Sequence, residues 1–317
     1  MTKERLRLML PFALFIAILA VSTASIFIRF AQTDAPSLVI AALRLTFASL
    51  ALAPLALTQH SSELQSLTPR ELLLGLLSGL LLAVHFATWI SSLEYTTIAS
   101  SVVLVSTGPL WVALLSPVFL REPITRPVLT GMSLALLGGI IIGLADACSW
   151  IHGLVCPSLS QILHGRMLFG NFLALVGAWM VAGYLMIGRK LRRKMSLVPY
   201  VFLVYGMASV CLLTAVLAAH ESVFGYHWLT YVWILLLALV PQLIGHSTYN
   251  WALAYLSAAF VAVMTLGEPI GSSILAYFIL QEAPTVTVIA GGVLILIGIY
   301  LSTRTTKIES EIKEIHD

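Results

Sequence analysis

The stretch from Thr88 to Gly138 recurs later in the chain without a gap. Sliding it by 160 positions lays it on Thr248 to Gly298. Residues that chance rarely matches then coincide: Pro109 with Pro269, Glu122 with Glu282, Gly131 with Gly291, and Gly138 with Gly298. An internal repeat constrains the fold more than other sequence features do, because it determines the architecture. Each copy has an apolar run with a proline, a turn with a glutamate, and a second apolar run with spaced glycines. This pattern is typical of paired membrane helices, and two such halves are a common plan of secondary transporters.

Composition places most of this chain in a lipid bilayer. Of its 317 residues, 59% are apolar and 10% are charged, and the mean hydropathy is +0.99. A soluble domain carries about 25% charged residues. We therefore expect an all-α integral membrane protein with ten transmembrane helices, arranged as two inverted five-helix repeats. The expected spans are Met9–Phe30, Leu38–Leu57, Leu72–Leu93, Ile98–Leu120, Val128–Leu144, Leu168–Ile187, Pro199–Ala219, Val232–Tyr255, Ala258–Leu280 and Val286–Leu301.

The distribution of lysine and arginine predicts the orientation, because short cytoplasmic loops are enriched in both. With the N-terminus inside, fourteen of these residues fall on the cytoplasmic side, and Arg166 is the one placed fully outside. Five spans per half is an odd number, so the second half enters the membrane inverted. We expect a first repeat over 1–144, an external loop over 145–167, a second repeat over 168–303, and a charged cytoplasmic tail over 304–317.

The sequence offers no sign of a cofactor, a metal site or bound nucleic acid. Cys148 and Cys156 share the expected external loop. The sequence leaves two alternatives for them, a disulfide or two free thiols. The basic cluster Arg189–Lys194 lies at a helix end. No HExxH, GxSxG or phosphate-loop motif is present in the sequence, so we do not expect an enzyme. The expected partners are a small-molecule substrate, the lipid bilayer and protons, and the protein is a monomer or a dimer.

Polar residues inside the spans are few, and such residues mark transport pathways. His85 and Trp89 are one helical turn apart, as are Gln242, His246 and Asn250, so each set shares one helix face. Trp179 is a further candidate for the cavity wall. Three roles are open to His85 and His246. They relay protons, they bind a polar substrate, or they are hydrogen-bonded groups of the bundle core. Arg44 is expected to be structural, with its side chain snorkelling toward the headgroups.

Two prolines and one acid complete the candidate set. Pro109 and Pro269 each release a backbone carbonyl, so each either kinks its helix or lines a wet cavity. Glu268 directly precedes Pro269, and its repeat equivalent is Gly108. An unpaired carboxylate at this depth is costly to keep charged, which suits a group that exchanges protons. The alternative is a structural ion pair with Arg44.

Together these residues resemble the EamA branch of the drug/metabolite transporter superfamily, over nearly the whole chain. The matching residues are Arg44, His85-Phe86 with Trp89, Pro109 with Glu122, Gln242, Gly245-His246, Asn250-Trp251, Glu268-Pro269 and Glu282. The resemblance implies ten helices in two inverted repeats, both termini in the cytoplasm, and a central cavity. It implies export of amino acids, other small metabolites or drugs across the cell inner membrane.

The sequence therefore predicts a secondary transporter that exports small metabolites, such as amino acids, or amphiphilic drug-like solutes. Alternating access and proton coupling are part of this expectation. Strongly anionic substrates are disfavoured, because Arg44 is the one cation that we place firmly within a span. The alternative functions are a multispan membrane enzyme acting on a lipid-linked or small polar substrate, and a membrane sensor.

Overall fold

The computed structural model describes residues 3–96, 98–121, 124–147, 149–150, 154–155, 166–280 and 286–305. Most of the expected external loop and most of the charged tail lie outside these ranges. So do four residues named above, Glu122, Glu282, Cys148 and Cys156. The question of a disulfide therefore falls outside the described residues.

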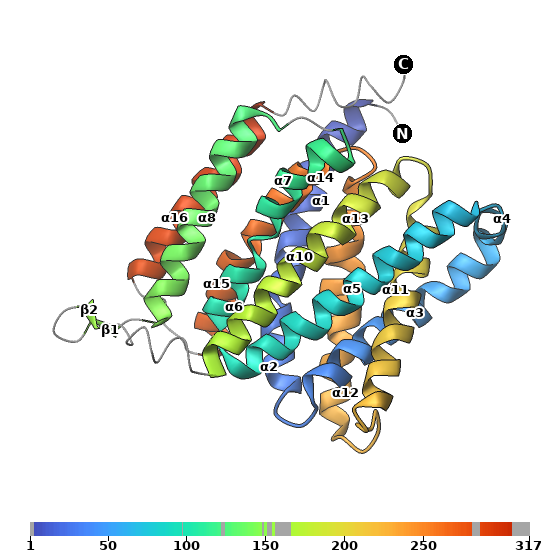
Figure 1. Cartoon of the computed structure of the whole chain (residues 1–317), viewed down its shortest axis with the longest axis horizontal. Helices are drawn as coiled ribbons and strands as arrows, with labels where there is room; N and C mark the ends of the chain where they lie inside the picture. The colour runs from blue at the N-terminus through green and yellow to red at the C-terminus, as the bar shows by residue number, and fades with distance from the viewer. Residues whose placement is uncertain are drawn as a thin grey trace.

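The described chain is helical apart from one antiparallel pair of two-residue strands, β1 (Ser149–Trp150) and β2 (Leu154–Val155). Figure 1 shows the helices as one bundle. The helices of the first half are α1 (Lys3–Ser22), α2 (Ala24–Ala31), α3 (Ser37–Gln59), α4 (Ser61–Gln65), α5 (Pro69–Tyr95), α6 (Ile98–Val105), α7 (Gly108–Phe119) and α8 (Arg126–Ala147). Those of the second half are α10 (Arg166–Arg192), α11 (Leu197–Ala218), α12 (Trp228–Leu237), the π-helix η1 (Ala238–His246), α13 (Ser247–Ala252), α14 (Ala258–Met264), the 3₁₀ turn η2 (Thr265–Gly267), α15 (Glu268–Leu280) and α16 (Val286–Thr305).

Seven helical stretches of the described residues are long and apolar enough to cross a bilayer. These are Met9–Ala31, Ser37–Gln59, Pro69–Tyr95, Leu168–Arg192, Leu197–Ala218, Trp228–Ala252 and Ala258–Ile279. Two shorter apolar helical stretches, Gly108–Phe119 and Ile289–Gly298, accompany them. The protein is therefore a multi-pass membrane protein, and the count of ten spans stays a prediction.

Helices from opposite halves of the chain pack side by side. α5 lies along α10, α3 along α11, and α8 along α16, while α1 packs against η1 (Figure 1). Exchanging each helix for its equivalent in the repeat maps the α5–α10 pair onto the η1–α1 pair. The same exchange maps the α3–α11 and α8–α16 pairs onto themselves. The inverted-repeat arrangement is the simplest source of this pattern, and we keep it as a proposal.

The two prolines of the repeat start new helices instead of bending continuous ones. α6 ends at Val105, and α7 begins at Gly108 with Pro109 as its second residue. In the second half, η2 separates α14 from α15, whose second residue is Pro269. Proline is tolerated in the first turn of a helix because the N–H it lacks would have no helical acceptor there. Both membrane helices are thus interrupted at equivalent positions.

Glycines allow the closest helix contacts. A methyl group at Gly79 would lie 2.6 Å from Cβ of Met207, and one at Gly138 would collide with the carbonyl of Gly291. The first contact joins α5 to α11, and the second joins α8 to α16. Small residues at such crossings let the backbones of membrane helices approach. Gly138 and Gly291 are both members of the sequence repeat.

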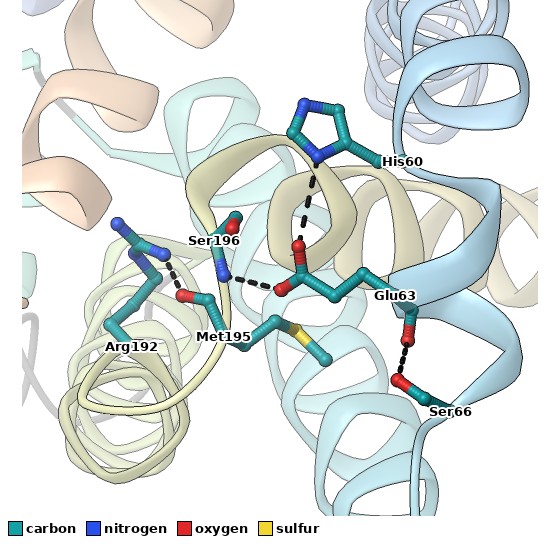
Figure 2. A network of polar contacts seen from close by, with 6 residues as sticks. All are labelled: His60, Glu63, Ser66, Arg192, Met195 and Ser196. Atoms are coloured by element: carbon teal, nitrogen blue, oxygen red, sulfur yellow. Dashed lines mark hydrogen bonds and ion pairs between the residues drawn. The ribbon is translucent and has the colours of Figure 1, made fainter.

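A polar network ties the α3–α5 connection to the α10–α11 connection (Figure 2). The backbone N–H of Ser196 donates to Oε1 of Glu63 at 2.6 Å, and Nδ1 of His60 lies 3.6 Å from Oε2 of the same carboxylate. Arg192 donates to the carbonyl of Met195 in the turn after α10. One glutamate in the short helix α4 thus links loops of the two halves at this end of the bundle.

Candidate functional site

A cavity lies within the bundle, where the two interrupted helices meet α1, α5, α10, η1 and α13. It offers about 50 Å³ to water molecules, which is room for roughly three to five of them. A metabolite would need a wider space than this. The lining residues are Val21, Ala24, His85, Trp89, Val105, Ser106, Gly108, Pro109, Val181, Leu185, His246, Tyr249, Thr265 and Glu268.

Glu268 brings an acidic group to this mostly apolar wall. It is the first residue of α15, directly after η2, and it is half-buried at the cavity. The hydroxyl of Tyr249, on the same wall, is buried and has no hydrogen-bond partner. Gly108, the repeat equivalent of Glu268, faces the same cavity without a side chain. The cavity is therefore acidic on the side of the second half only.

His85 is held in one tautomer by the backbone of α10. Its Nδ1 lies 2.9 Å from the carbonyl oxygen of Gly177. A carbonyl oxygen only accepts, so Nδ1 carries a proton. In the neutral ring, Nε2 is then an acceptor. The ring stacks on Trp89 with centroids 6.0 Å apart, and the indole Nε1 of Trp89 is buried without a partner.

Arg44 lies in the protein core and not at the lipid headgroups, so the expected snorkelling is wrong. Its side chain is 0% exposed, its Nε donates to Oε1 of Gln242 at 2.9 Å, and its Cζ lies 4.1 Å from the ring centroid of Phe86. The helix face that carries Arg44 packs against the second half, so the side chain has no path to the lipid surface. Nη1 and Nη2 have no hydrogen-bond partner. A hydrogen-bonded pair between Arg44 and Glu268 is therefore not formed in this conformation.

Gln242 and Asn250 lie near the cavity but not in its wall. Gln242 is fully buried and binds Arg44. Asn250 is also fully buried, and its Nδ2 donates to the hydroxyl of Tyr184 and, at 3.4 Å, to that of Tyr205. The hydroxyl of Tyr205 also contacts Oγ of Ser247 at 3.1 Å. These bonds join α10, α11 and α13 beneath the cavity.

Two arginines extend this hydrogen-bonded region toward the end of α10. Nε of Arg192 donates to the carbonyl of Asn250 at 3.0 Å, and Nη1 of Arg189 donates to the carbonyl of Leu253 at 2.8 Å. Both side chains are buried, and both stabilise free carbonyls at the C-terminus of α13. The sequence offered only a basic cluster at a helix end, because it does not reveal which carbonyls face these side chains.

The remaining candidates divide between the cavity and the periphery. His246 lines the cavity, and its ring lies edge-on to Phe86 with centroids 5.4 Å apart. Pro109 also lines it, whereas Pro269 is buried behind Glu268. Trp179 is 37% exposed and packs edge-on against Trp111, outside the cavity wall. Within the described residues, no three His, Cys, Asp or Glu side chains are grouped to hold a metal ion.

At the opposite end of the bundle, Asp34 fixes the start of α12. Its Oδ2 accepts from Oγ1 of Thr230 and from the N–H of His227, each at 2.8 Å. These two bonds, that from Thr230 first, lower the pKa of Asp34 below its ordinary value of 3.8. This contact joins the loop after α2 to the second half.

Comparison with known proteins places the whole chain in one group. The model of the EamA-like transporter family matches residues 9–144 and again residues 168–304. A protein of Archaeoglobus fulgidus named as an uncharacterized transporter is 25% identical over 294 residues, which covers 92% of this chain and 95% of that protein. A second uncharacterized transporter of the same organism is 23% identical over 228 residues, covering 72% of this chain and 73% of its own length.

A solved structure described only as the crystal structure of a protein has the same fold. It superposes with a TM-score of 0.72 at 17% sequence identity. The superposition covers 92% of this chain and 95% of that one. At this identity the likeness concerns the fold alone.

Proposed function

Because this chain belongs to the EamA-like transporter family, and so is a multi-pass membrane transporter and not an enzyme, we propose that it is a proton-coupled exporter. The proposed cargo is a small metabolite, such as an amino acid, or an amphiphilic drug-like solute. Transport proceeds by alternating access across the cell inner membrane. The observation that carries the proposal is the cavity at the interrupted helices, with Glu268 in its wall.

The proposed architecture has ten spans in two inverted repeats, with both termini in the cytoplasm. Three observations support it: the bias of Lys and Arg, the helix pairings that survive exchange of the halves, and the two separate matches to the family model. Inverted-repeat transporters bind substrate near the bilayer midplane, between the repeats and at discontinuous helices. Residues of both halves line the cavity, which supports a substrate site there.

The proposed coupling uses Glu268 as a group that holds either a proton or a cationic part of the substrate. A buried carboxylate is costly when it is charged and unpaired. While the cavity is open to the cytoplasm, Glu268 binds the ammonium group of the substrate. When the cavity opens outward, a proton from outside neutralises Glu268 and the substrate leaves. The proton is then released inside, so one proton enters for each substrate exported.

The proposed role of the neighbouring side chains is to bind a polar head within aromatic walls. Trp89, Tyr249 and the ring of His246 provide these walls. The indole N–H of Trp89 and the hydroxyl of Tyr249 are unused donors, and Nε2 of His85 is an acceptor. Such a wall with a few polar groups suits an amphiphilic solute.

Glu268→Gln tests the proposed coupling. In proteoliposomes loaded with a labelled amino acid panel, the wild type should show efflux that a pH gradient accelerates. The variant should bind substrate more weakly, because its amide lacks the charge that pairs with the ammonium group. It should also lose this acceleration, because an amide does not take up a proton at neutral pH. Unchanged pH-driven efflux would rule the role out. A structural pair with Arg44 predicts a lower melting temperature instead, which Arg44→Gln in the same protein would restore.

A further inference from the structure

The guanidinium of Arg44 keeps most of its donors unused. Arginine has five N–H donors and no acceptor. Nε uses one of them on Gln242, while Nη1 and Nη2 are buried and have no hydrogen-bond partner. Leaving charged donors buried without an acceptor costs free energy. A ligand that supplies two acceptor atoms would remove this cost.

Gln242 fixes which edge of the guanidinium is free. Oε1 of Gln242 holds Nε from the side of η1, and the ring of Phe86 covers one face with its centroid 4.1 Å from Cζ. Nη1 and Nη2, which form a fork, are the donors of Arg44 that have no hydrogen-bond partner. This fork matches the spacing of the two oxygens of a carboxylate.

Phe86 contacts both the guanidinium of Arg44 and the cavity wall. Phe86 is itself absent from the cavity wall, yet its ring contacts three residues of that wall, His85, Trp89 and His246. The ring centroids of these pairs lie 4.8, 6.4 and 5.4 Å apart. Arg44 is therefore one side chain away from the cavity. A rotation of Phe86 would open the guanidinium to a ligand.

We infer that Arg44 binds the carboxylate group of the transported solute once Phe86 turns aside. This inference rests on the proposed function and specifies one end of its substrate. Glu268 is an acid of the cavity wall, and no hydrogen bond joins it to Arg44. With Phe86 turned aside, the cavity would have a cationic pole at Arg44 and an acidic pole at Glu268. A zwitterion with its carboxylate at Arg44 and its ammonium at Glu268 satisfies both poles.

The same geometry disfavours a dianion such as a phosphate monoester. A single guanidinium balances one negative charge, and the second charge would lie toward Glu268 without a cation. Arg189 and Arg192 do not supply one, because they bind the carbonyls of Leu253 and Asn250. The solute is therefore a monocarboxylate.

Three probes that share a phenyl ring separate the two poles. L-phenylalanine carries both charged groups, 2-phenylethylamine lacks the carboxylate, and 3-phenylpropionate lacks the ammonium. Binding is measured by calorimetry on the purified full-length protein in detergent. The wild type should bind L-phenylalanine roughly tenfold to a hundredfold tighter than 2-phenylethylamine, as for hydrogen bonds between charged groups. Arg44→Gln should abolish this ratio while it leaves the affinity for 2-phenylethylamine within about twofold.

Thr46→Val is the matched control for a merely structural role. Thr46 lies on the same helix, and its hydroxyl contacts that of Ser209 at 2.7 Å. Its loss should lower the affinities for L-phenylalanine and 2-phenylethylamine equally, if at all. The same equal loss in Arg44→Gln would overturn the inference. Arg44→Lys keeps the charge but not the fork, and should restore only part of the ratio.

If Arg44→Gln does not fold, Phe86→Ala provides the measurement. Removing the ring opens the fork, so the affinity for 3-phenylpropionate should rise while that for 2-phenylethylamine does not. Unchanged relative affinities would overturn the inference. Equal affinity of the wild type for L-phenylalanine and 2-phenylethylamine, including no measurable binding of either, would also overturn it. These binding ratios are measured without a pH gradient, whereas the proposed function is tested by pH-driven efflux of the wild type, so the two stand or fail separately.

Discussion

At Asp34, one exposed carboxylate holds two donors of the second half, and its stabilising effect depends on pH. The hydrogen bonds from Thr230 and from the N–H of His227 lower its pKa in the folded protein. Stability from such a group is present above the pKa of the unfolded carboxyl and is lost as the pH falls through the folded pKa. The difference in melting temperature between the wild type and Asp34→Ala should thus be present at pH 7. It should shrink below about pH 4.

Thermal unfolding in detergent at both pH values checks this expectation. Ser222→Ala is the control, because Ser222 is also exposed but bonds within its own turn, to Phe224. A difference between wild type and Asp34→Ala that stays constant with pH would contradict the role of the charged carboxylate.

The positions of individual side chains were the least accurate part of the prediction from sequence. The four-residue spacing of His85 and Trp89 placed both on one face, and both line the cavity. The same spacing grouped Gln242 and Asn250 with His246, but these two amides bind Arg44 and Tyr184 instead. Spacing gives the face of a helix and not its rotation within the bundle. That rotation depends on contacts between the halves, which no local pattern encodes.

At the scale of helices, the contact of α5 with α11 depends on a missing side chain. A methyl group at Gly79 would lie 2.6 Å from Cβ of Met207 and 2.7 Å from the carbonyl oxygen of Val204. The carbonyl is backbone and does not move without shifting α11. Gly79→Ala should therefore destabilise the protein by about 1–3 kcal/mol, as overpacking does.

Gly292 in α16 is the matched control, because a methyl group there meets no atom within 4 Å. Gly292→Ala should leave stability unchanged or raise it by up to about 1 kcal/mol, through helix propensity. Denaturation of both variants in the same detergent compares them. Equal stabilities would show that the approach of α5 to α11 is not limiting.

At Pro109 and Pro269 the sequence predicted a kink or a carbonyl that lines a wet cavity, and the structure instead begins a new helix at each. Each proline marked a place where a helix ladder loses a donor. The π-helix η1, which contains Pro241, was not expected, since the apolar pattern of this span reads as one continuous helix. A π-turn depends on how the segment fits its neighbours, and η1 packs against both α1 and α3.

For the whole molecule, the proposed topology places the α3–α5 and α11–α12 connections on opposite sides of the membrane. Ser66 and Ser222 are exposed residues of these two connections. In a variant whose native cysteines are replaced by alanine, Ser222→Cys should react with a membrane-impermeant maleimide in intact cells. Ser66→Cys should react only after permeabilisation. Labelling of Ser66→Cys in intact cells would contradict the inverted arrangement.

The hydrogen bond between Arg44 and Gln242 has a mechanical consequence. It fastens α3, encoded in the first half, to η1 in the second, and α3 also lies along α11. In the proposed alternating-access cycle, the pieces that rock against one another would therefore be composites of both halves. A chain severed in the loop between the repeats would yield two fragments, and the first would carry a buried cation without its amide partner. The proposed inverted repeat divides the sequence into two halves, whereas this hydrogen bond joins helices of both.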